Sequence, residues 1–280
     1  MGKRPKKAEW EWKTAGATAK ARPGMLYEPG NWGDVLKGTW AAAVAGALAR
    51  TKRPGPLVYL DPYAGSPSYP LTQGARERLF QLTGSGLAAL QAPFARRGLW
   101  ASTALLVRAA CEAAGCGAEL RVYDLDAERR AAWREIPGAG ALPVRSGLHA
   151  LEGARAAQTA PNLILLDPYD FLAEWRELLP HALALAERSA VLAYVYSRAP
   201  RSAGYWNEYR RFREALTSGR TGGGYLLGRI PSDAVLPRAY HEVVLLAGPE
   251  VLETVREGLR GATRALARGL AETGAFEEQA

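Results

Sequence analysis

The chain has 280 residues, of which 48% are hydrophobic, and this composition suits a globular protein with a sizeable core. No apolar run reaches the ~18–20 residues that a membrane-spanning helix needs. The basic N-terminus lacks the apolar stretch of a secretory signal, so we expect no membrane association and a cytoplasmic location.

The formal net charge of +8 is concentrated in a basic tail, residues 1–24. Seven Lys and Arg residues stand there against Glu9 and Glu11, which leaves a net charge of only +3 for the rest of the chain. With Trp10 and Trp12, the tail could hold phosphates and stack on bases, or it could be a flexible solubilising leader. Both interpretations stay open, and residues 25–280 are expected to form the folded domain.

Helices and strands alternate after the tail. Residues 31–50 predict a helix with Asn31 as its N-cap and an apolar stripe of Leu36, Trp40, Val44 and Leu48. Seven apolar runs predict strands at residues 56–65, 118–126, 141–147, 162–169, 189–197, 223–231 and 241–248. Because helical segments separate most of these runs, we expect an α/β fold with a doubly wound, mostly parallel seven-stranded sheet.

A long connection, residues 66–101, follows the first strand, and its sequence predicts a helical insertion. Two cysteines, Cys111 and Cys116, are too few for a disulfide framework. No neighbouring His or Cys completes a ligand set with them, so we expect small buried thiols and no metal site.

Polar and aromatic residues follow four of the predicted strands: Asp61, Tyr63 and Gly65; Asp124; Ser146 and Gly147; and Asp167, Pro168 and Tyr169. In a doubly wound sheet such groups meet at one crevice. An acid after the second strand suits a ribose diol, and a glycine permits close approach of backbone to a ligand. The first loop lacks the GxGxxG pattern of a pyrophosphate cradle, which favours a nucleoside ligand such as S-adenosylmethionine.

Three stretches resemble class I S-adenosylmethionine-dependent methyltransferases, and most of all the RlmJ-type ribosomal-RNA adenine-N6 methyltransferases. "GNWGDVLKGTW" resembles the family's "GNxADVLKHxx", and "LVYLDPYAGSPSYPL" resembles its "FLYLDTHAGxGxYxL". "LILLDPYDF" stands where the family has "LILIDPPYE". The resemblance covers roughly residues 27–250 and implies the class I methyltransferase fold.

The resemblance also implies the residues that would hold the cofactor: Asn31, Asp34 and Lys37 in a loop and helix that close over it, Asp61, Tyr63 and Gly65 in its loop, Ser102 near its methionine end, Asp124 at its ribose, and Ser146 and Gly147 beside its adenine. Asp167, Pro168 and Tyr169 match the catalytic motif for the target base. There Asp167 would accept hydrogen bonds from the adenine amine, and the ring of Tyr169 would stack on the flipped base.

Four positions depart from the family's pattern. Only one proline separates Asp167 from Tyr169, Gly38 and Tyr63 stand where the family has His, and Ser146 stands where it has Asp. The sequence predicts a methyltransferase that acts on adenine N6 in nucleic acid, RNA in preference to DNA. The departures leave open a degenerate relative that binds nucleic acid or serves as a scaffold. A methyltransferase for a small molecule or a protein also stays open.

Structural roles compete with these functional ones. Asp124 or Asp167 could cap the helix that follows it, and Tyr63 or Tyr169 could be a packing residue. A run of arginines forms either an RNA-facing patch or a solvated helix face: Arg198, Arg201, Arg210, Arg211 and Arg213.

Overall fold

The computed structural model describes residues 29–51, 55–144, 146–198, 203–218, 224–231, 239–269 and 275–279. The basic tail, residues 1–24, lies outside the described residues, as do Arg145 and Arg201. In the part of the chain that is described, no helix combines the length and the apolar character needed to cross a bilayer.

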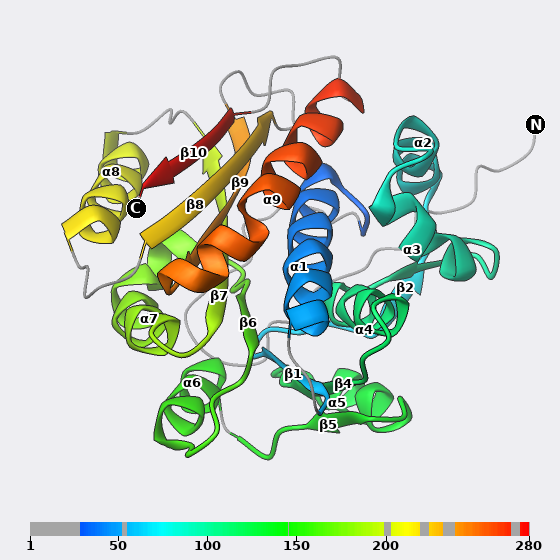
Figure 1. Cartoon of the computed structure of the whole chain (residues 1–280), viewed down its shortest axis with the longest axis horizontal. Coiled ribbons are helices and arrows are strands. Elements are labelled where there is room, and N and C mark those ends of the chain that lie inside the picture. The colour runs from blue at the N-terminus through cyan, green and yellow to red at the C-terminus, as the bar shows by residue number, and fades with distance from the viewer. Residues whose placement is uncertain are drawn as a thin grey trace, which may run out of the picture.

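An eight-stranded sheet with the order β10-β8-β9-β7-β6-β1-β4-β5 forms the centre of the described structure (Figure 1). Its strands are β1 (Leu57–Asp61), β4 (Ala118–Val122), β5 (Ala139–Ala141), β6 (Leu163–Leu166), β7 (Ala190–Arg198), β8 (Gly224–Pro231), β9 (Ala239–Ala247) and β10 (Ala275–Gln279). The five strands from β5 to β7 run parallel, whereas β9 is antiparallel to both β7 and β8. The predicted α/β fold, with seven strands wound into a mostly parallel sheet, is confirmed.

The sequence does not predict β10, which extends the sheet beyond β8. It pairs antiparallel with β8, with Ala275 opposite Arg229. An edge strand has one neighbour and can be held by backbone hydrogen bonds, so its sequence need not show the apolar run of a central strand. The segment "AFEEQ" shows no such run.

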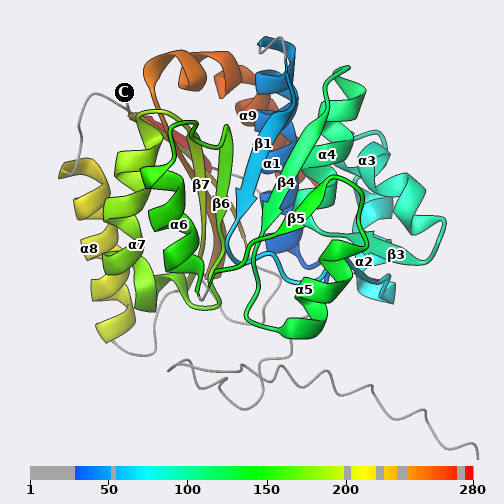
Figure 2. The same cartoon turned by 90° about the horizontal axis from the view of Figure 1, so that it is seen from below.

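Helices cover both faces of the sheet (Figure 2). On one face lie α1 (Trp32–Thr51), α4 (Thr103–Ala113) and α9 (Pro249–Gly269), and on the other lie α6 (Gly147–Ala156), α7 (Phe171–Ala186) and α8 (Ala203–Ser218). Strand β6 serves both cores, because Leu163 and Leu165 point to the α1 side and Ile164 and Leu166 to the α7 side. This two-sided burial explains why the run "LILL" has no polar residue.

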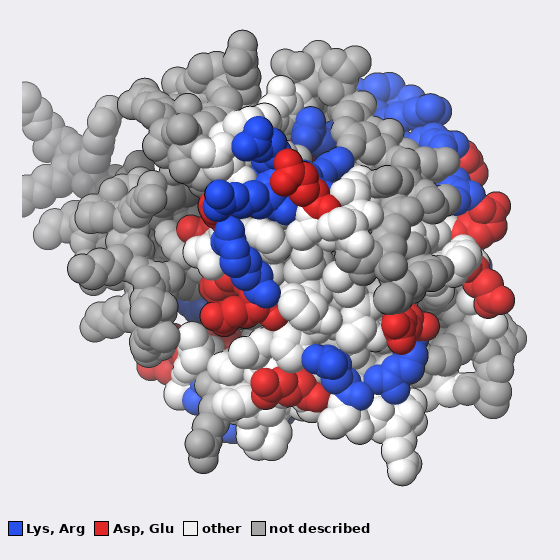
Figure 3. All heavy atoms as spheres, turned by 90° about the vertical axis from the view of Figure 1, so that its left-hand side faces the viewer, with Lys and Arg blue, Asp and Glu red and all other residues white. Residues whose placement is uncertain are grey.

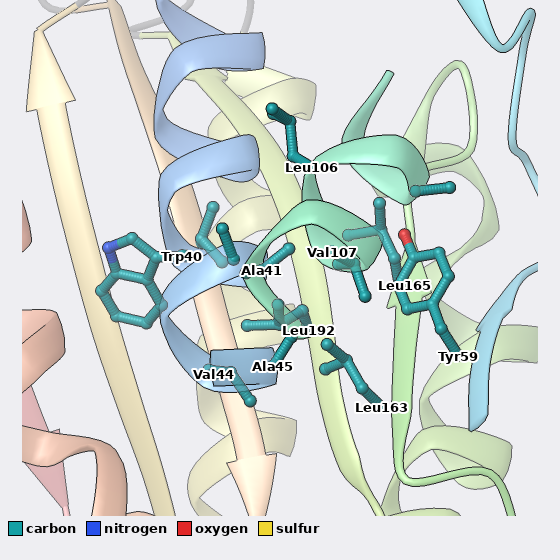
Figure 4. Close-up of a cluster of buried hydrophobic side chains, with 14 of the residues drawn as sticks. Trp40, Ala41, Val44, Ala45, Tyr59, Leu106, Val107, Leu163, Leu165 and Leu192 are labelled. Atoms are coloured by element: carbon teal, nitrogen blue, oxygen red, sulfur yellow. The ribbon is translucent and has the colours of Figure 1, made fainter. Parts of the chain in front are cut away.

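Helix α1 is buried on nearly every side. Its predicted N-cap is confirmed, since the Asp34 backbone N–H donates to Oδ1 of Asn31 at 3.0 Å. The predicted stripe is too narrow, because Ala41 and Ala45 are buried as well. Figure 4 shows these alanines in one cluster with side chains of α4 and the central strands, and their small size lets α4 approach closely.

The predicted helical insertion contains β2 (Ser68–Pro70), α2 (Gln73–Gln81), α3 (Gly86–Ala95) and β3 (Leu99–Ala101). Each helix begins at a side-chain cap, Thr72 for α2 and Ser85 for α3. β2 and β3 pair antiparallel as a small separate sheet that the sequence does not predict. In Figures 1 and 2 the insertion and α8 lie on opposite sides of the molecule.

Candidate functional site

The candidate site lies beyond the carboxyl ends of three neighbouring strands. Asp61 ends β1, Asp124 follows β4, and Asp167 follows β6 directly, and β1 lies between the other two strands. The chain leaves β1 for α4 on one face and β6 for α7 on the other, so this is a switch point of the sheet. Ligands of doubly wound folds bind at such a point.

Asp167 is bound by Lys37 of α1, which is 130 residues away in the sequence. Nζ of Lys37 donates to Oδ2 of Asp167, lies 3.1 Å from Oδ1 of Asp34, and stands 5.1 Å from the centre of the Tyr194 ring. Burial acts to lower the pKa of Lys37, but Asp167 and Asp34 outweigh it and raise that pKa well above its usual value. The structure thus brings these two predicted site residues together and holds Lys37 as an ammonium.

Asp61 is buried and interacts electrostatically with both members of this pair. Its Oδ2 accepts from the Tyr59 hydroxyl and its Oδ1 from the Tyr63 backbone N–H, both at 3.0 Å. Burial raises the pKa of Asp61 to about 7, since the charge of Asp167 adds to the burial and the two hydrogen bonds only partly oppose it. Asp61 therefore titrates near neutral pH.

Asp124 holds the first loop in place. Its Oδ2 accepts from the Gly65 N–H at 3.1 Å and lies 3.3 Å from Nη1 of Arg129, and its Oδ1 accepts from the Asp126 N–H at 2.8 Å. The N-cap of α5 (Ala127–Arg134) is Asp126, so the capping alternative for Asp124 is wrong. A carboxylate offers about four lone-pair positions, so about one is left for a ligand hydroxyl rather than the two a diol would use.

The backbone conformation of the first loop and a close side-chain contact both require glycine at position 65. Its φ of +63° is left-handed, and a Cβ at this position would lie 2.3 Å from the Tyr69 hydroxyl. The Trp133 indole N–H donates to the Gly65 carbonyl at 2.9 Å. The close approach that the sequence assigns to a ligand is made by Tyr69 of the same chain.

The ring of Tyr63, in the first loop, packs against the start of α6 and does not offer a free face to a ligand. A Cβ on Gly147 would lie 2.7 Å from Cζ of the Tyr63 ring, so the missing side chain of Gly147 makes room for that ring. Ser146 caps α6, since its Oγ accepts from the His149 N–H at 3.2 Å. The packing interpretation therefore applies to Tyr63.

The four residues of the "DPYD" stretch, 167–170, differ in their exposure and their contacts. Pro168 is buried, whereas Tyr169 is 52% exposed beside Asp167. Asp170 caps α7 by accepting from the Ala173 N–H, so Asp167 is not the capping acid. The exposure of Tyr169 also excludes a buried packing role for its ring.

Ser102, which the resemblance places near the methionine end of the cofactor, has a structural role in the chain, and the predicted burial of the two thiols holds for only one of them. Ser102 is the buried N-cap of α4, and its Oγ accepts from the Leu105 N–H at 3.4 Å. Both cysteines are free thiols, with Cys111 buried and Cys116 half-buried.

A cavity of about 500 Å³ lies beside Asp124, and the sequence does not predict it. The ends of β4 and β5, the residues after them and two arginines of α5 line it: Tyr123, Leu125, Arg130, Arg134, Ala141, Leu142, Pro143 and Val144. Leu125 is 51% exposed, although it is large and apolar. An apolar residue directly after the acid at a strand end is the signal that could have indicated this cavity.

Two more residues near the site carry no recognisable signal in the sequence. The Tyr194 hydroxyl of β7 lies 2.7 Å from Nδ1 of His241 in β9. Both belong to runs that the sequence marks only as strands. Their meeting depends on the antiparallel pairing of β7 with β9, which the sequence does not specify.

No family model matches the chain, and no curated protein matches its sequence. Among solved structures, protein LPL1258 of Legionella pneumophila str. Philadelphia 1, a member of family DUF519, has a TM-score of 0.66 at 12% identity and covers 90% of this chain and 98% of its own. A spermidine synthase has a TM-score of 0.41 at 10% identity, covering 86% of this chain and 75% of its own. TYW2 of M. jannaschii has a TM-score of 0.34 at 9% identity, covering 80% and 77%.

At 12% identity, the likeness to LPL1258 shows the fold alone. The strand order and the switch point agree with the fold that the sequence motifs imply. The chain thus has a doubly wound, Rossmann-like α/β fold.

Proposed function

We propose that the chain is an S-adenosylmethionine-dependent methyltransferase that acts on an adenine amine in RNA or DNA. The observation that supports this most is the pairing of acids with exposed apolar side chains at the crevice. Leu125 follows Asp124, Tyr169 follows Asp167, and each is about half exposed although large and apolar. One side of the crevice thus offers a surface for the cofactor, and the other offers one for a base.

The residues present fit S-adenosylmethionine. Asp124 keeps an acceptor position for a ribose hydroxyl, and the neighbouring cavity offers Tyr123, Leu125 and Val144 to the flat adenine. Asp61 and Ser102 would face the amino-acid end, where a carboxylate pairs with an ammonium group. When bound, the cofactor supplies an electrophilic methyl group.

On the target side, Asp167 would accept hydrogen bonds from the exocyclic amine. The lone pair of that nitrogen is delocalised into the purine ring, and acceptors on its N–H groups favour the pyramidal form that attacks. A cofactor held there would supply the methyl carbon with its sulfur as the leaving group, which would keep the electron pair of the broken bond, and the attacking nitrogen would give its proton to water. Tyr169 would hold the base by stacking, and correct placement supplies much of the rate.

Lys37 would position Asp167 for this step. Burial raises the pKa of Asp167 above its usual value, and the ammonium of Lys37 opposes this shift by favouring the ionised carboxylate, which accepts hydrogen bonds only. Asp34 lies 3.1 Å from the same ammonium, so Lys37 keeps a partner when Asp167 turns toward a substrate. We therefore assign Lys37 a positioning role.

One observation favours a second candidate, a methyltransferase-fold protein that binds nucleic acid without transfer. The acid that would accept from the amine is already bound by Lys37, and three acceptor positions of Asp124 are used within the chain. A protein whose acceptor positions are used in this way would keep the fold but would not catalyse the transfer.

Calorimetry of the full chain with S-adenosylmethionine is the first test, and we expect binding. Incubation with a cofactor labelled in its methyl group, together with RNA or DNA oligonucleotides, should then yield N6-methyladenine after digestion. No heat at millimolar cofactor would end the proposal. Cofactor binding without transfer to nucleic acid would support the second candidate, and label in a protein or a small molecule would replace the proposed substrate class.

A further inference from the structure

The helical insertion carries the excess positive charge of the folded part of the chain. Residues 66–101 contain four arginines against a single acid, Glu77, which gives a net charge of +3. Residues 25–280 as a whole also have a net charge of +3. The rest of the folded part is therefore neutral in sum, and the excess sits on one insertion at one side of the molecule (Figure 1).

The arginines of the insertion differ from those elsewhere in how they are paired. Arg76, Arg96 and Arg97 are exposed, and none forms an ion pair with any residue that the structure describes. The only acid of the insertion, Glu77, accepts from Gln73 instead. These three guanidinium groups present uncompensated charge to solvent.

Two arginines of α8, by contrast, are paired along their own helix. Arg210 lies 3.8 Å from Glu214, and Arg211 lies 3.1 Å from Glu208. Figure 3 shows this side of the molecule, where acidic atoms lie beside the basic ones. Two members of the arginine run that the sequence offers as an RNA-facing patch, Arg210 and Arg211, are thus neutralised.

Phe80 places an exposed aromatic ring on the same insertion as these three arginines. It is 81% exposed and follows Arg76 by four residues on α2, so the two side chains share one helix face. The Gly98 carbonyl accepts from the Leu71 N–H at 2.8 Å, which places Arg96 and Arg97 near the start of the same helix. A ring one helical turn from a guanidinium group, with two more near the start of the same helix, could stack a base and hold its phosphates.

The insertion also contacts the turn that precedes α1, the helix that carries Lys37. Nη1 of Arg78 donates to the Gly30 carbonyl at 3.1 Å, and the Gly30 N–H donates to Oδ2 of Asp34 at 2.8 Å. Asp34 in turn is paired with Lys37, which binds Asp167. A strand lying on the insertion would therefore be close to the crevice, and the basic tail joins the described chain next to Gly30.

We propose that Arg76, Phe80, Arg96 and Arg97 form a docking surface for single-stranded nucleic acid, which leads the target base to the crevice. The choice of partner rests on the proposed function. A lipid surface fits less well, because the other large apolar side chains of α2 and α3 (Leu79, Leu87, Leu90 and Phe94) pack on the core and leave Phe80 as a single ring.

The test is binding of fluorescein-labelled single-stranded RNA and DNA of about 20 nucleotides by the full chain at several salt concentrations. Arg76→Ala/Arg96→Ala/Arg97→Ala should weaken binding by about tenfold or more and lower the salt slope by about 2, at about 0.7 per phosphate contact. Phe80→Ala should weaken binding by about fivefold or more and leave the slope unchanged.

The matched control is Arg210→Ala/Arg211→Ala/Arg260→Ala, which removes the same charge from ion-paired positions and should weaken binding by less than about twofold. Equal losses in the two triple variants would overturn the proposal. So would a loss of binding to phosphatidylglycerol vesicles with unchanged nucleic-acid affinity. A stronger effect on RNA than on DNA, or the reverse, would identify the strand while supporting the surface.

Failure of this proposal and failure of the proposed function are distinguishable. Cofactor binding by the insertion variants, measured by calorimetry, should equal that of the unaltered chain. If the chain bound no cofactor but the insertion variants lost affinity for nucleic acid as predicted, the docking surface would be supported and the proposed methyl transfer would be refuted. If it transferred methyl groups while the triple insertion variant bound nucleic acid normally, only the docking surface would fall.

Discussion

Lys37 illustrates how one side chain joins distant parts of the sequence. Its ammonium is nearly buried, and the carboxylates of Asp34 and Asp167 with the ring of Tyr194 surround it. A buried charge loses its hydration and needs such partners to remain ionised. The sequence around Lys37 predicts only a helix, and the contact with Asp167 gives the residue its place in the site.

Replacing Lys37 with Met should lower the free energy of unfolding by about 3–5 kcal/mol, because two carboxylates would then be buried without their cation. Urea denaturation measures this change. Arg211→Met, at an exposed ion pair, should change stability by less than about 1 kcal/mol. Equal effects of the two substitutions would show that the Lys37 pair is not buried in solution.

The raised pKa of Asp61 predicts that the stability of the chain depends on pH. Its pKa is about 7 in the folded chain and about 4 when unfolded, so the folded state binds the proton more tightly. The free energy of unfolding should therefore fall, relative to that of Asp61→Asn, as the pH rises from about 4 to about 7. Denaturation of both chains at about pH 5 and pH 8 tests this, and a constant difference between them would contradict it.

Asp167 and Asp170 can be separated by substitution, since only one of them caps α7. Asp170→Ala should cost about 1 kcal/mol of stability and leave methyl transfer intact. Asp167→Ala should abolish transfer and leave the affinity for S-adenosylmethionine largely unchanged. Labelled transfer and calorimetry on both variants provide the measurement, and loss of transfer in Asp170→Ala would refute this division of roles.

Among the elements, α1 depends on a close contact with the antiparallel part of the sheet. The Trp40 ring is fully buried, and its indole N–H donates to Oγ1 of Thr263 in α9 at 3.1 Å. A Cβ on Gly228 of β8 would lie 2.2 Å from Cζ2 of that ring. The ring is held by its hydrogen bond, so the strand can approach only because residue 228 has no side chain.

Gly228→Ala should therefore destabilise the chain by roughly 1–3 kcal/mol through overpacking. Gly258→Ala is the matched control, since Gly258 lies exposed in α9 with open space where its Cβ would be. It should stabilise the chain by about 0.5–1 kcal/mol, because Ala favours a helix over Gly. Thermal denaturation followed by circular dichroism distinguishes the two, and opposite signs are expected.

At the scale of the whole molecule, the positive charge is divided between two places. The tail has a net charge of +5 and the insertion +3, and the remaining residues are neutral in sum. A charged tail that joins the chain next to the insertion adds to the attraction for a polyanion. This division of charge is the basis on which we propose nucleic acid as the partner of the insertion.

Deleting residues 1–24 should weaken binding of single-stranded RNA and reduce its salt dependence, because up to seven cations are removed. The loss should add to that of the insertion substitutions, which lie elsewhere in the sequence. Fluorescence anisotropy at several salt concentrations measures both. Unchanged affinity after the deletion would leave the tail as a solubilising leader and would remove its role in binding.

The sequence by itself determined the local structure. Six of the seven predicted strands lie where short apolar runs stand, because a strand buried on both faces needs apolar residues at successive positions. The third prediction, residues 141–147, is wrong, because β5 covers Ala139–Ala141 and is only partly buried. Asn31 caps α1, and the three acids lie at one sheet edge, because parallel strands place their carboxyl ends together. These features follow from residue type and spacing within short segments.

Only the tertiary structure decided which of these residues contact one another, and which already have packing or hydrogen-bond partners within the chain. Tyr63 packs on Gly147, Tyr69 fills the space beside Gly65, and Lys37 binds Asp167. The edge strand β10 and the exposed face of the insertion also became visible only there. The physical reason is that periodicity and capping act between near neighbours, whereas these contacts join segments whose distance depends on the packing of the whole chain.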